Sequence, residues 1–176
     1  MLGMSSPEWT RYLHDELAVS LDPQEINRQV VRRMQELYRE QLPLLPGALD
    51  VVRALRQRWP LGLASSSNRE IIELFLELGD LAGMFAATVS SEEVARGKPA
   101  PDVYLAAAEE MGVDPARSVA VEGSSNGLRA ATAAGMTVIA VPNPHYPPTD
   151  DALELVAATV DAIADLTPEL VERVAG

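Results

Sequence analysis

Apolar residues recur at helical spacing in the N-terminal part of the chain. Ser6-Pro7-Glu8 begins one predicted helix, and Asp22-Pro23 begins a second. Both are common helix starts, because proline suits the first helical position and Ser or Asp caps the free amides. The apolar stripes contain Trp9, Tyr12, Leu13 and Leu17 in the first helix and Ile26, Val30, Met34, Leu37 and Tyr38 in the second. The pattern predicts a small helical unit.

This helical pattern stops at a Pro- and Gly-rich segment, residues 42–47. Such segments break helices and are typical of subdomain boundaries. We therefore predict a helical subdomain over residues 1–43 and a second unit over residues 44–176.

In the second unit, short apolar runs alternate with helical patterns. Helices are predicted over residues 48–59, 69–78, 101–111, 125–134 and 168–174. Strands are predicted over residues 61–64, 85–89, 118–121, 137–141 and, more weakly, 157–160. This alternation indicates an α/β fold, in which a Rossmann-like parallel sheet is covered by helices on both faces.

Composition narrows the function classes. The chain has 176 residues and a net charge of −12 with no basic stretch, which disfavours nucleic acid and anionic membrane surfaces as partners. It has no cysteine and only two histidines, so thiolate chemistry and a His-based zinc site are excluded. No apolar run approaches the length of a membrane span and no signal peptide is recognisable, so a cytoplasmic location is expected.

The candidate chemistry lies after the strands, because ligands of open α/β sheets bind beyond the carboxyl ends. Ser65-Ser66-Ser67-Asn68 follows the first predicted strand and opens a helix. Hydroxyls and free amides at that position can bind an anion. The same residues are good helix N-caps, and for this segment alone the cap is the better interpretation.

Lys98 is the only lysine of the chain, beside thirteen arginines. A lysine in such a sequence indicates a site that needs a compact ammonium and not a planar guanidinium. Chance is the alternative, since a lone lysine in a loop is usually solvated. The Gly and Pro residues of Gly97-Lys98-Pro99-Ala100-Pro101 hold this lysine in place and favour contact with phosphate.

Glu122 directly follows the predicted strand over residues 118–121. A carboxylate at a strand end is well placed to ligate a hard cation, although it can also face solvent or cap the next helix. The hydroxyl of Ser65, the ammonium of Lys98 and the carboxylate of Glu122 follow separate parallel strands. Together they suit a phosphoryl group bound with Mg²⁺, and the set is much more specific than any member.

These segments resemble the haloacid dehalogenase (HAD) superfamily, and within it the β-phosphoglucomutase-like phosphatases. The resemblance runs from about Leu44 to Val141, and residues 1–42 resemble the later part of that branch's helical cap. It rests on Leu-Ala-Ser65-Ser-Ser-Asn, Gly-Lys98-Pro-Ala-Pro-Asp-Val-Tyr and Val-Glu122-Gly-Ser-Ser-Asn-Gly. The resemblance implies that Ser65 and Lys98 are catalytic residues that hold the phosphoryl group. It also implies that the backbone of Ser66, with Asn68 and Arg69, contacts phosphate and that Glu122 lies near Mg²⁺.

Two departures from the family pattern change the expected activity. The nucleophile of the family lies in an Asp-x-Asp motif, which this sequence does not contain, and Gly123 stands where the family usually has a second acid. Without the aspartate no covalent phospho-enzyme can form. With Glu122 as the one carboxylate, Mg²⁺ binding is expected to be weak or absent.

The resemblance also implies that the family's first strand, normally central between those ending at Ser65 and Glu122, is missing and that the chain is truncated at its N-terminus. The two flanking strands then keep unpaired edges or pair with each other. Exposed edges invite partner strands, so reduced stability and self-association are expected.

Two functional interpretations remain open from the sequence. The leading one is a relative of Mg²⁺-dependent phosphatases or phosphomutases that is impaired towards its substrate, a small phosphorylated metabolite such as a sugar phosphate. The other is a non-catalytic phosphate-binding or interaction module, which Gly123 favours. A dinucleotide-dependent oxidoreductase is disfavoured, because no Gly-x-Gly-x-x-Gly follows a strand. Dehalogenation also occurs in the superfamily, but the Lys-Pro-Ala-Pro context and the helical cap favour a phosphatase.

Overall fold

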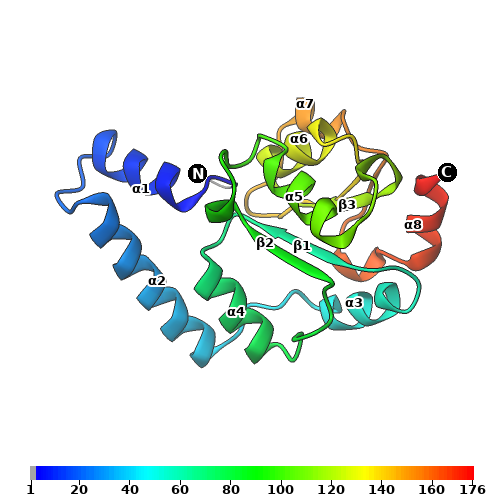
Figure 1. Ribbon diagram of the computed structural model, residues 1–176, viewed down its shortest axis with the longest axis horizontal. Helices are drawn as coiled ribbons and strands as arrows, with labels where there is room; N and C mark the ends of the chain where they lie inside the picture. Colours follow the sequence, from blue (N-terminus) through cyan, green and yellow to red (C-terminus); the bar gives the residue numbers. More distant parts are fainter. Residues whose placement is uncertain (1–2) are drawn as a thin grey trace.

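The computed structural model describes residues 3–176. Its first two helices, α1 (Ser6–Asp15) and α2 (Pro23–Glu40), pack against each other and extend away from the rest of the chain (Figure 1). The predicted Asp22 cap of α2 forms, whereas α1 is capped by Ser5 and not by the predicted Ser6, which is the first residue of the helix. The Ser5 amide and hydroxyl donate to Glu8 at 2.7 Å, and Asp22 accepts from the first amides of α2 at 3.0 Å.

The helical unit contacts the rest of the protein mainly through α2, which packs on α4 (Arg69–Leu78). The first helix, α1, also contacts the short 3-10 helix over Ser91–Glu93. Ile26 and Val31 are the buried residues of α2, and the Tyr38 ring meets the Phe75 ring edge-on at 5.9 Å. Residues 41–47 follow without helix and end at Gly47, whose φ of 81° is left-handed and favours glycine. The division of the chain at residues 43 and 44 stays a prediction.

Helices and strands alternate after Gly47, which confirms the predicted α/β class. The strands are β1 (Gly62–Ser65), β2 (Ala87–Ser90), β3 (Val119–Glu122), β4 (Thr137–Ala140) and β5 (Ala158–Thr159). The remaining α-helices are α3 (Ala48–Arg56), α5 (Asp102–Met111), α6 (Ser125–Ala133), α7 (Asp150–Leu153) and α8 (Pro168–Ala175). Short 3-10 helices are η1 (Ser91–Glu93), η2 (Pro115–Arg117) and η3 (Ile163–Asp165).

Most predicted boundaries differ from these by one residue, and the larger differences are in two places. The helix expected to reach Trp59 ends at Arg56, and the second strand begins at Ala87 and not at Phe85. The short α7 and the 3-10 helices were not predicted, because a single turn leaves too short a pattern to recognise.

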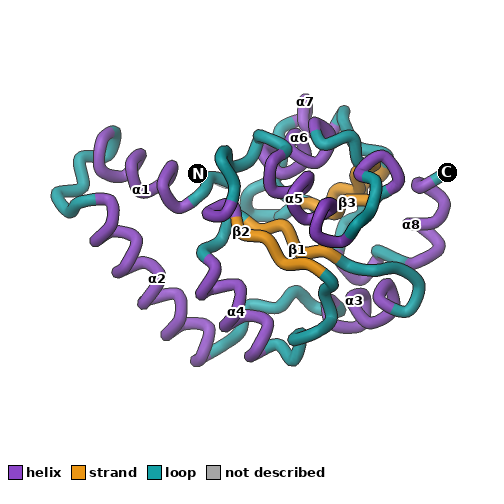
Figure 2. The backbone as a smooth tube through the Cα atoms, viewed as in Figure 1, coloured by secondary structure: helices purple, strands orange, loops and turns teal. Residues whose placement is uncertain are grey.

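All strand pairs are parallel, as predicted, but the strands form two separate sheets. β1 pairs with β2, from Gly62 opposite Ala87 to Ser65 opposite Ser90. β3 pairs with β4, and β4 with β5. Within residues 3–176 no strand joins β1 to β3, and the tube in Figure 2 shows β1 and β2 side by side with β3 set apart. The facing edges of β1 and β3 are therefore left unpaired, which is the first of the two expected arrangements.

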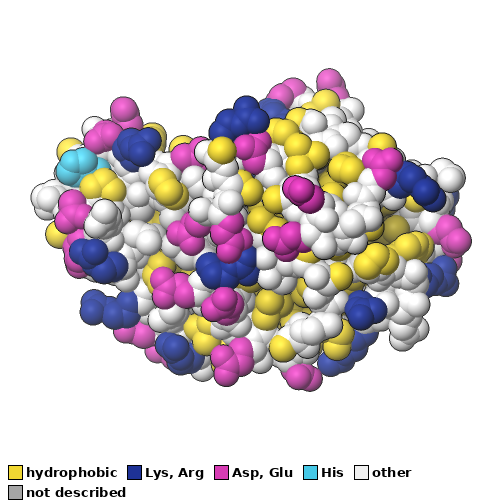
Figure 3. Space-filling view, viewed as in Figure 1, with side chains coloured by type: hydrophobic (Ala, Val, Ile, Leu, Met, Phe, Trp, Pro, Cys, Tyr) yellow, Lys and Arg dark blue, Asp and Glu magenta, His cyan; other side chains and the backbone are white. Residues whose placement is uncertain are grey.

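Helices cover the strands on both sides, with α5 and α6 on one side and α3 and α4 on the other (Figure 1). One core cluster centres on Val103, Leu128 and Val138 beneath α5 and α6, and a second joins α3 and α8 to Ile139 of β4. Charged side chains are dense over α1 and α2, whereas more apolar atoms reach the surface over the α/β part (Figure 3). No helix in the described part of the chain is long and apolar enough to cross a membrane.

Candidate functional site

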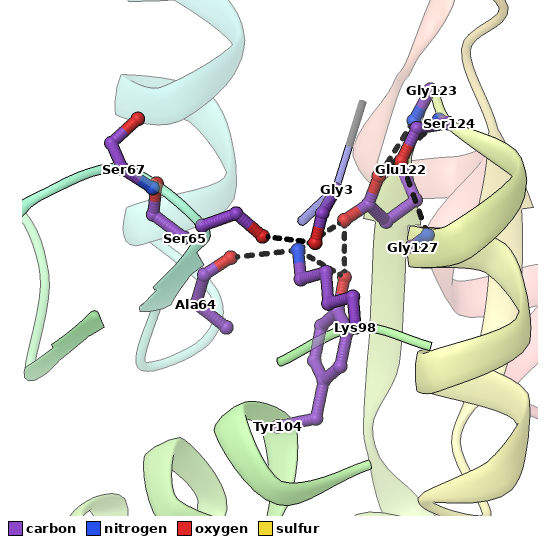
Figure 4. Close-up of polar contacts among 11 residues, drawn as sticks. Gly3, Ala64, Ser65, Ser67, Lys98, Tyr104, Glu122, Gly123, Ser124 and Gly127 are labelled. Carbon is purple, nitrogen blue, oxygen red and sulfur yellow. Dashed lines mark hydrogen bonds and ion pairs between the residues drawn. The ribbon is translucent and has the colours of Figure 1, made fainter. Parts of the chain in front are cut away.

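Lys98 lies between the carboxyl ends of β1 and β3 and connects the two sheets (Figure 4). Lys98 is only 5% exposed, which is unusual because lysine is seldom buried. Nζ donates to the Ala64 carbonyl of β1 at 3.1 Å, approaches the Tyr104 hydroxyl at 3.4 Å and forms an ion pair with Glu122 of β3. The ammonium also lies 4.8 Å from the centre of the Tyr104 ring. The predicted ammonium and carboxylate therefore meet.

The Glu122 carboxylate is bonded through both oxygens. Oε1 accepts from Lys98 and from the Tyr104 hydroxyl at 2.7 Å. Oε2 accepts from the Gly123 amide at 3.0 Å and from the Ser124 hydroxyl at 3.3 Å. A Cβ built on Gly127 would overlap the carboxylate, so only glycine lets the first turn of α6 approach so closely.

These contacts determine the charge states in the cluster. Burial alone would raise the pKa of Glu122. The Lys98 ammonium and the hydrogen bonds from Lys98, Tyr104 and Gly123 together outweigh burial, so the pKa lies below its ordinary value of 4.5. Burial, and then the Glu122 charge, raises the pKa of Tyr104 well above its usual range. At neutral pH the cluster therefore holds a carboxylate and a neutral phenol that donates to it.

Ser65 and Ser66, at the end of β1 and in the loop after it, lie beside this cluster. Ser65 Oγ accepts from the Ser67 amide at 3.1 Å, so its own hydrogen can still be donated to a ligand. Ser66 Oγ donates to the Gly3 carbonyl at 2.8 Å. Ser65 is thus oriented by its own loop, on the β1 side of the Lys98 ammonium (Figure 4).

Two other predicted phosphate contacts are held elsewhere. The buried Asn68 amide donates to Asn27 of α2 at 3.1 Å and to Glu92 of η1 at 2.7 Å. The Arg69 guanidinium pairs with Glu93 and donates to Thr88. Both side chains join α4 to neighbouring elements. Phosphate binding by Asn68 stays a prediction that would require its amide to leave these partners.

A magnesium ion does not fit the residues present. Mg²⁺ takes octahedral oxygen ligands, usually one or two carboxylates with substrate phosphate and water. Across residues 3–176 no group of three or more Asp, Glu, His or Cys side chains is placed to hold a metal ion. Glu122 is the carboxylate of the cluster, and both of its oxygens are already bonded. Gly123 adds no ligand, and a Cβ at this position would lie 2.6 Å from the Val141 carbonyl oxygen.

Tyr104 is the site residue that sequence reasoning missed. It lies in the first turn of α5, six residues after Lys98, and it is 7% exposed. In the sequence, Tyr104 fits the apolar stripe of a helix, so the pattern predicts an ordinary core residue. The signal was the chemistry of the side chain, because a buried tyrosine hydroxyl usually has a polar partner.

Comparison with known proteins identifies the family that this chain matches. Residues 1–135 match the haloacid dehalogenase-like hydrolases. Hexitol phosphatase B of Escherichia coli strain K12 is 38% identical over 145 residues, which are 82% of this chain and 65% of that protein. The chain thus spans slightly less than two thirds of the length of this relative.

Solved structures agree with the fold. CbbY of Rhodobacter sphaeroides, crystallised in complex with phosphate, has a TM-score of 0.79 and 29% identity, and the match covers 88% of this chain and 70% of that one. β-Phosphoglucomutase of Clostridium difficile also has a TM-score of 0.79, with 98% of this chain and 78% of that chain covered. At 21% identity, the latter likeness concerns the fold alone.

Proposed function

The chain belongs to the haloacid dehalogenase-like hydrolases, and we propose that its Lys98 cluster binds the phosphoryl group of a small phosphomonoester without turning it over. The observation that carries the proposal is the position of Lys98. The only lysine of the chain is buried at the carboxyl ends of two strands, beside a hydroxyl that can still donate.

Each residue has a definite role in this proposal. The Lys98 ammonium neutralises the phosphate charge, and the Ser65 hydroxyl donates to a phosphate oxygen. Backbone amides at the start of α4, that of Ser66 included, add neutral donors. Glu122 holds the ammonium between the strands, and Tyr104 keeps the carboxylate oriented.

Turnover needs groups that this chain does not supply. Its sequence contains no Asp-x-Asp, and Ser65 has no general base among its hydrogen-bond partners in the described structure. Members of the family generally use Mg²⁺, but the residues around Glu122 do not fit the ion. The proposed phosphate binding therefore does not depend on magnesium.

Similar proteins support a class of ligand for this site. One similar protein is named a hexitol phosphatase, and another, CbbY, was crystallised with phosphate and, as a mutant, with xylulose-1,5-bisphosphate. These names support a sugar phosphate or a similar small phosphorylated metabolite as the ligand.

Thermal unfolding with inorganic phosphate tests the proposal. A ligand at one hundred times its Kd stabilises the folded state by about 2.7 kcal/mol, or roughly 5–11 °C for a chain of this size. We expect this rise in Tm with phosphate in EDTA, no further rise when Mg²⁺ replaces the EDTA, and none with chloride at equal ionic strength. A rise only with Mg²⁺ would show that a cation site assembles after all, and no rise in either buffer would exclude the binding role.

A further inference from the structure

The segment from the last residue of β1 to the start of α4 supplies the hydroxyl and the amides of the proposed phosphate site. We call residues 65–68 the phosphate loop. A flexible loop loses conformational entropy when a ligand orders it, so a loop that is already ordered binds more tightly. The contacts that order the phosphate loop therefore bear directly on phosphate affinity.

Ser90 holds the middle of the phosphate loop. It is the last residue of β2, lies opposite Ser65 in the strand register and is fully buried. Its hydroxyl donates to the Ser67 carbonyl at 2.7 Å and accepts from the Glu92 amide at 3.2 Å. The accepted bond caps η1, as serine at a helix start commonly does. The donated bond has no part in that cap and points to a second task.

The bond from Ser90 fixes the orientation of the peptide between Ser67 and Asn68. In a planar trans peptide the carbonyl and the N–H point in opposite directions. Because the Ser67 carbonyl points to Ser90, the Asn68 N–H points away from Ser90. The Ser67 amide is held in turn by Ser65 Oγ at 3.1 Å. These bonds together hold the Ser65 hydroxyl and the loop amides in one arrangement.

Glu92 holds the end of the phosphate loop. Its Oε1 accepts from the Asn68 side-chain amide at 2.7 Å, and its Oε2 accepts from the Arg69 backbone amide at 3.0 Å. Donors at the start of a helix are otherwise suited to an anionic ligand. The Glu92 carboxylate takes these two, so Asn68 and Arg69 anchor the loop and leave the phosphate to the residues before them.

We propose that Ser90 and Glu92 are positioning residues, which hold the phosphate loop in its binding geometry without touching the ligand. The Ser90 hydroxyl already donates to Ser67, and an ionised carboxylate such as that of Glu92 only accepts hydrogen bonds and cannot donate to phosphate. The inference rests on the proposed phosphate binding and deepens it. It gives a role to the segment after β2, to which the proposed function assigns none.

Glu92→Ala is the sharpest test, because the charge and the positioning role predict opposite results. Removing a carboxylate near a phosphate site reduces electrostatic repulsion, which alone would tighten binding. Losing the two anchoring bonds loosens the loop, which weakens binding. In calorimetric titration of the full chain with inorganic phosphate, we expect the Kd to rise about tenfold. A Kd that is unchanged or lower would overturn the inference.

Glu92→Gln separates the anchoring bonds from the charge. Glutamine keeps one acceptor oxygen for Asn68 or Arg69 and removes the negative charge. Its Kd for phosphate should therefore be lower than that of Glu92→Ala. Glu92 is exposed, so both variants are expected to fold. Equal affinities of the two variants would mean that the anchoring bonds do not matter for binding, which contradicts the positioning role.

Ser90→Ala tests the other anchor without changing any charge. The Kd for phosphate should again rise about tenfold, and Ser90→Thr, which keeps the hydroxyl, should restore most of the affinity. Ser118→Ala is the matched control. The Ser118 hydroxyl donates to the Asp114 carbonyl at 2.8 Å just before β3, at the opposite end of the strands from the site, so its loss should leave the Kd unchanged. Wild-type affinity in Ser90→Ala would overturn the role of Ser90.

A stability control separates loop position from a general loss of folding. Val171→Ala truncates a side chain of α8 in the second core cluster, so it should lower Tm without raising the Kd for phosphate. If the Kd of this variant rises as much as that of Ser90→Ala, lost stability explains the weaker binding, and the positioning role is wrong. If Ser90→Ala does not fold, the two Glu92 variants decide the question.

The titration of the wild type distinguishes failure of this inference from failure of the proposed function. If the wild type does not bind phosphate, the proposed function is wrong and no positioning role remains. If the wild type binds phosphate and Ser90→Ala and Glu92→Ala bind it equally well, this inference alone is wrong and the proposed function stands.

Discussion

Replacing Lys98 by methionine isolates the charge that joins the two sheets. Methionine keeps a long unbranched side chain but removes the ammonium. Glu122 then stays in a site where its side chain is only 13% exposed, without its cationic partner. The perturbation is therefore a lone buried carboxylate and not a cavity.

The size of the effect follows from the contacts that Glu122 retains. Breaking a buried ion pair by removing one partner costs about 3–5 kcal/mol. Tyr104, Gly123 and Ser124 still donate to the carboxylate, so the lower end applies, about 3 kcal/mol. For a chain of this length that loss lowers Tm by roughly 6–12 °C.

Differential scanning calorimetry at neutral pH measures this loss. Arg96→Met is the matched control, because Arg96 lies two residues away and pairs with Asp102 while its side chain is 70% exposed. This control should barely change Tm. The double variant Lys98→Met with Glu122→Gln removes both charges and should recover most of the loss, because the two effects are coupled.

The pH dependence of this Tm difference shows whether the unpaired Glu122 carboxylate causes the loss of stability. In the wild type the pKa of Glu122 lies below its ordinary 4.5, so its stabilising contribution is present above pH 4.5 and is lost as the pH falls through the lowered value. Removing Lys98 takes away the two largest causes that lower the pKa of Glu122, so this pKa rises relative to the wild type and the variant gains stability relative to the wild type as protons bind. The difference in Tm should therefore shrink between pH 7 and about pH 4. A difference that stays constant with pH, or a double variant no better than the single one, would refute the buried-charge explanation.

Further predictions concern the loops around the site. Gly123→Ala should cost about 1–3 kcal/mol in urea unfolding, because its Cβ would lie 2.6 Å from the Val141 carbonyl oxygen; an unchanged midpoint would contradict this geometry. Gly127→Ala displaces the Glu122 carboxylate, so it should weaken phosphate binding in calorimetric titration; unaltered affinity would mean that Glu122 does not position Lys98. Asn68→Ala should destabilise the protein by about 1–3 kcal/mol through its lost bonds to Asn27 and Glu92, and no loss in thermal unfolding would contradict that role.

The sequence predicted the site best where chemistry and local pattern agreed. Lys98 was recognisable because a solitary lysine stood between glycine and prolines, and Glu122 because an acid ended an apolar strand. The parallel arrangement followed from alternating strands and helices. That Lys98 and Glu122 meet was predictable from this arrangement, since carboxyl ends of parallel strands share one edge.

Other features depend on contacts that no local pattern records. Asn68 reads as a cap or an anion ligand, but its amide binds Asn27, which lies 41 positions earlier. Gly127 reads as a helix residue, yet it is required by the approach of Glu122. The unpaired edges of β1 and β3 were one of two arrangements expected only through the family resemblance, because the pattern of a strand does not show which neighbour it pairs with.

Phosphorus-31 NMR of a hexitol phosphate with a stoichiometric amount of the chain tests the central claim most directly. Binding and turnover are read from the same spectrum in EDTA and in Mg²⁺. The account predicts that the phosphomonoester signal shifts or broadens in both buffers and that no inorganic phosphate signal appears over hours. Steady growth of inorganic phosphate would contradict the account by requiring a nucleophile that we do not identify, and an unperturbed phosphomonoester signal would contradict the proposed binding by Lys98.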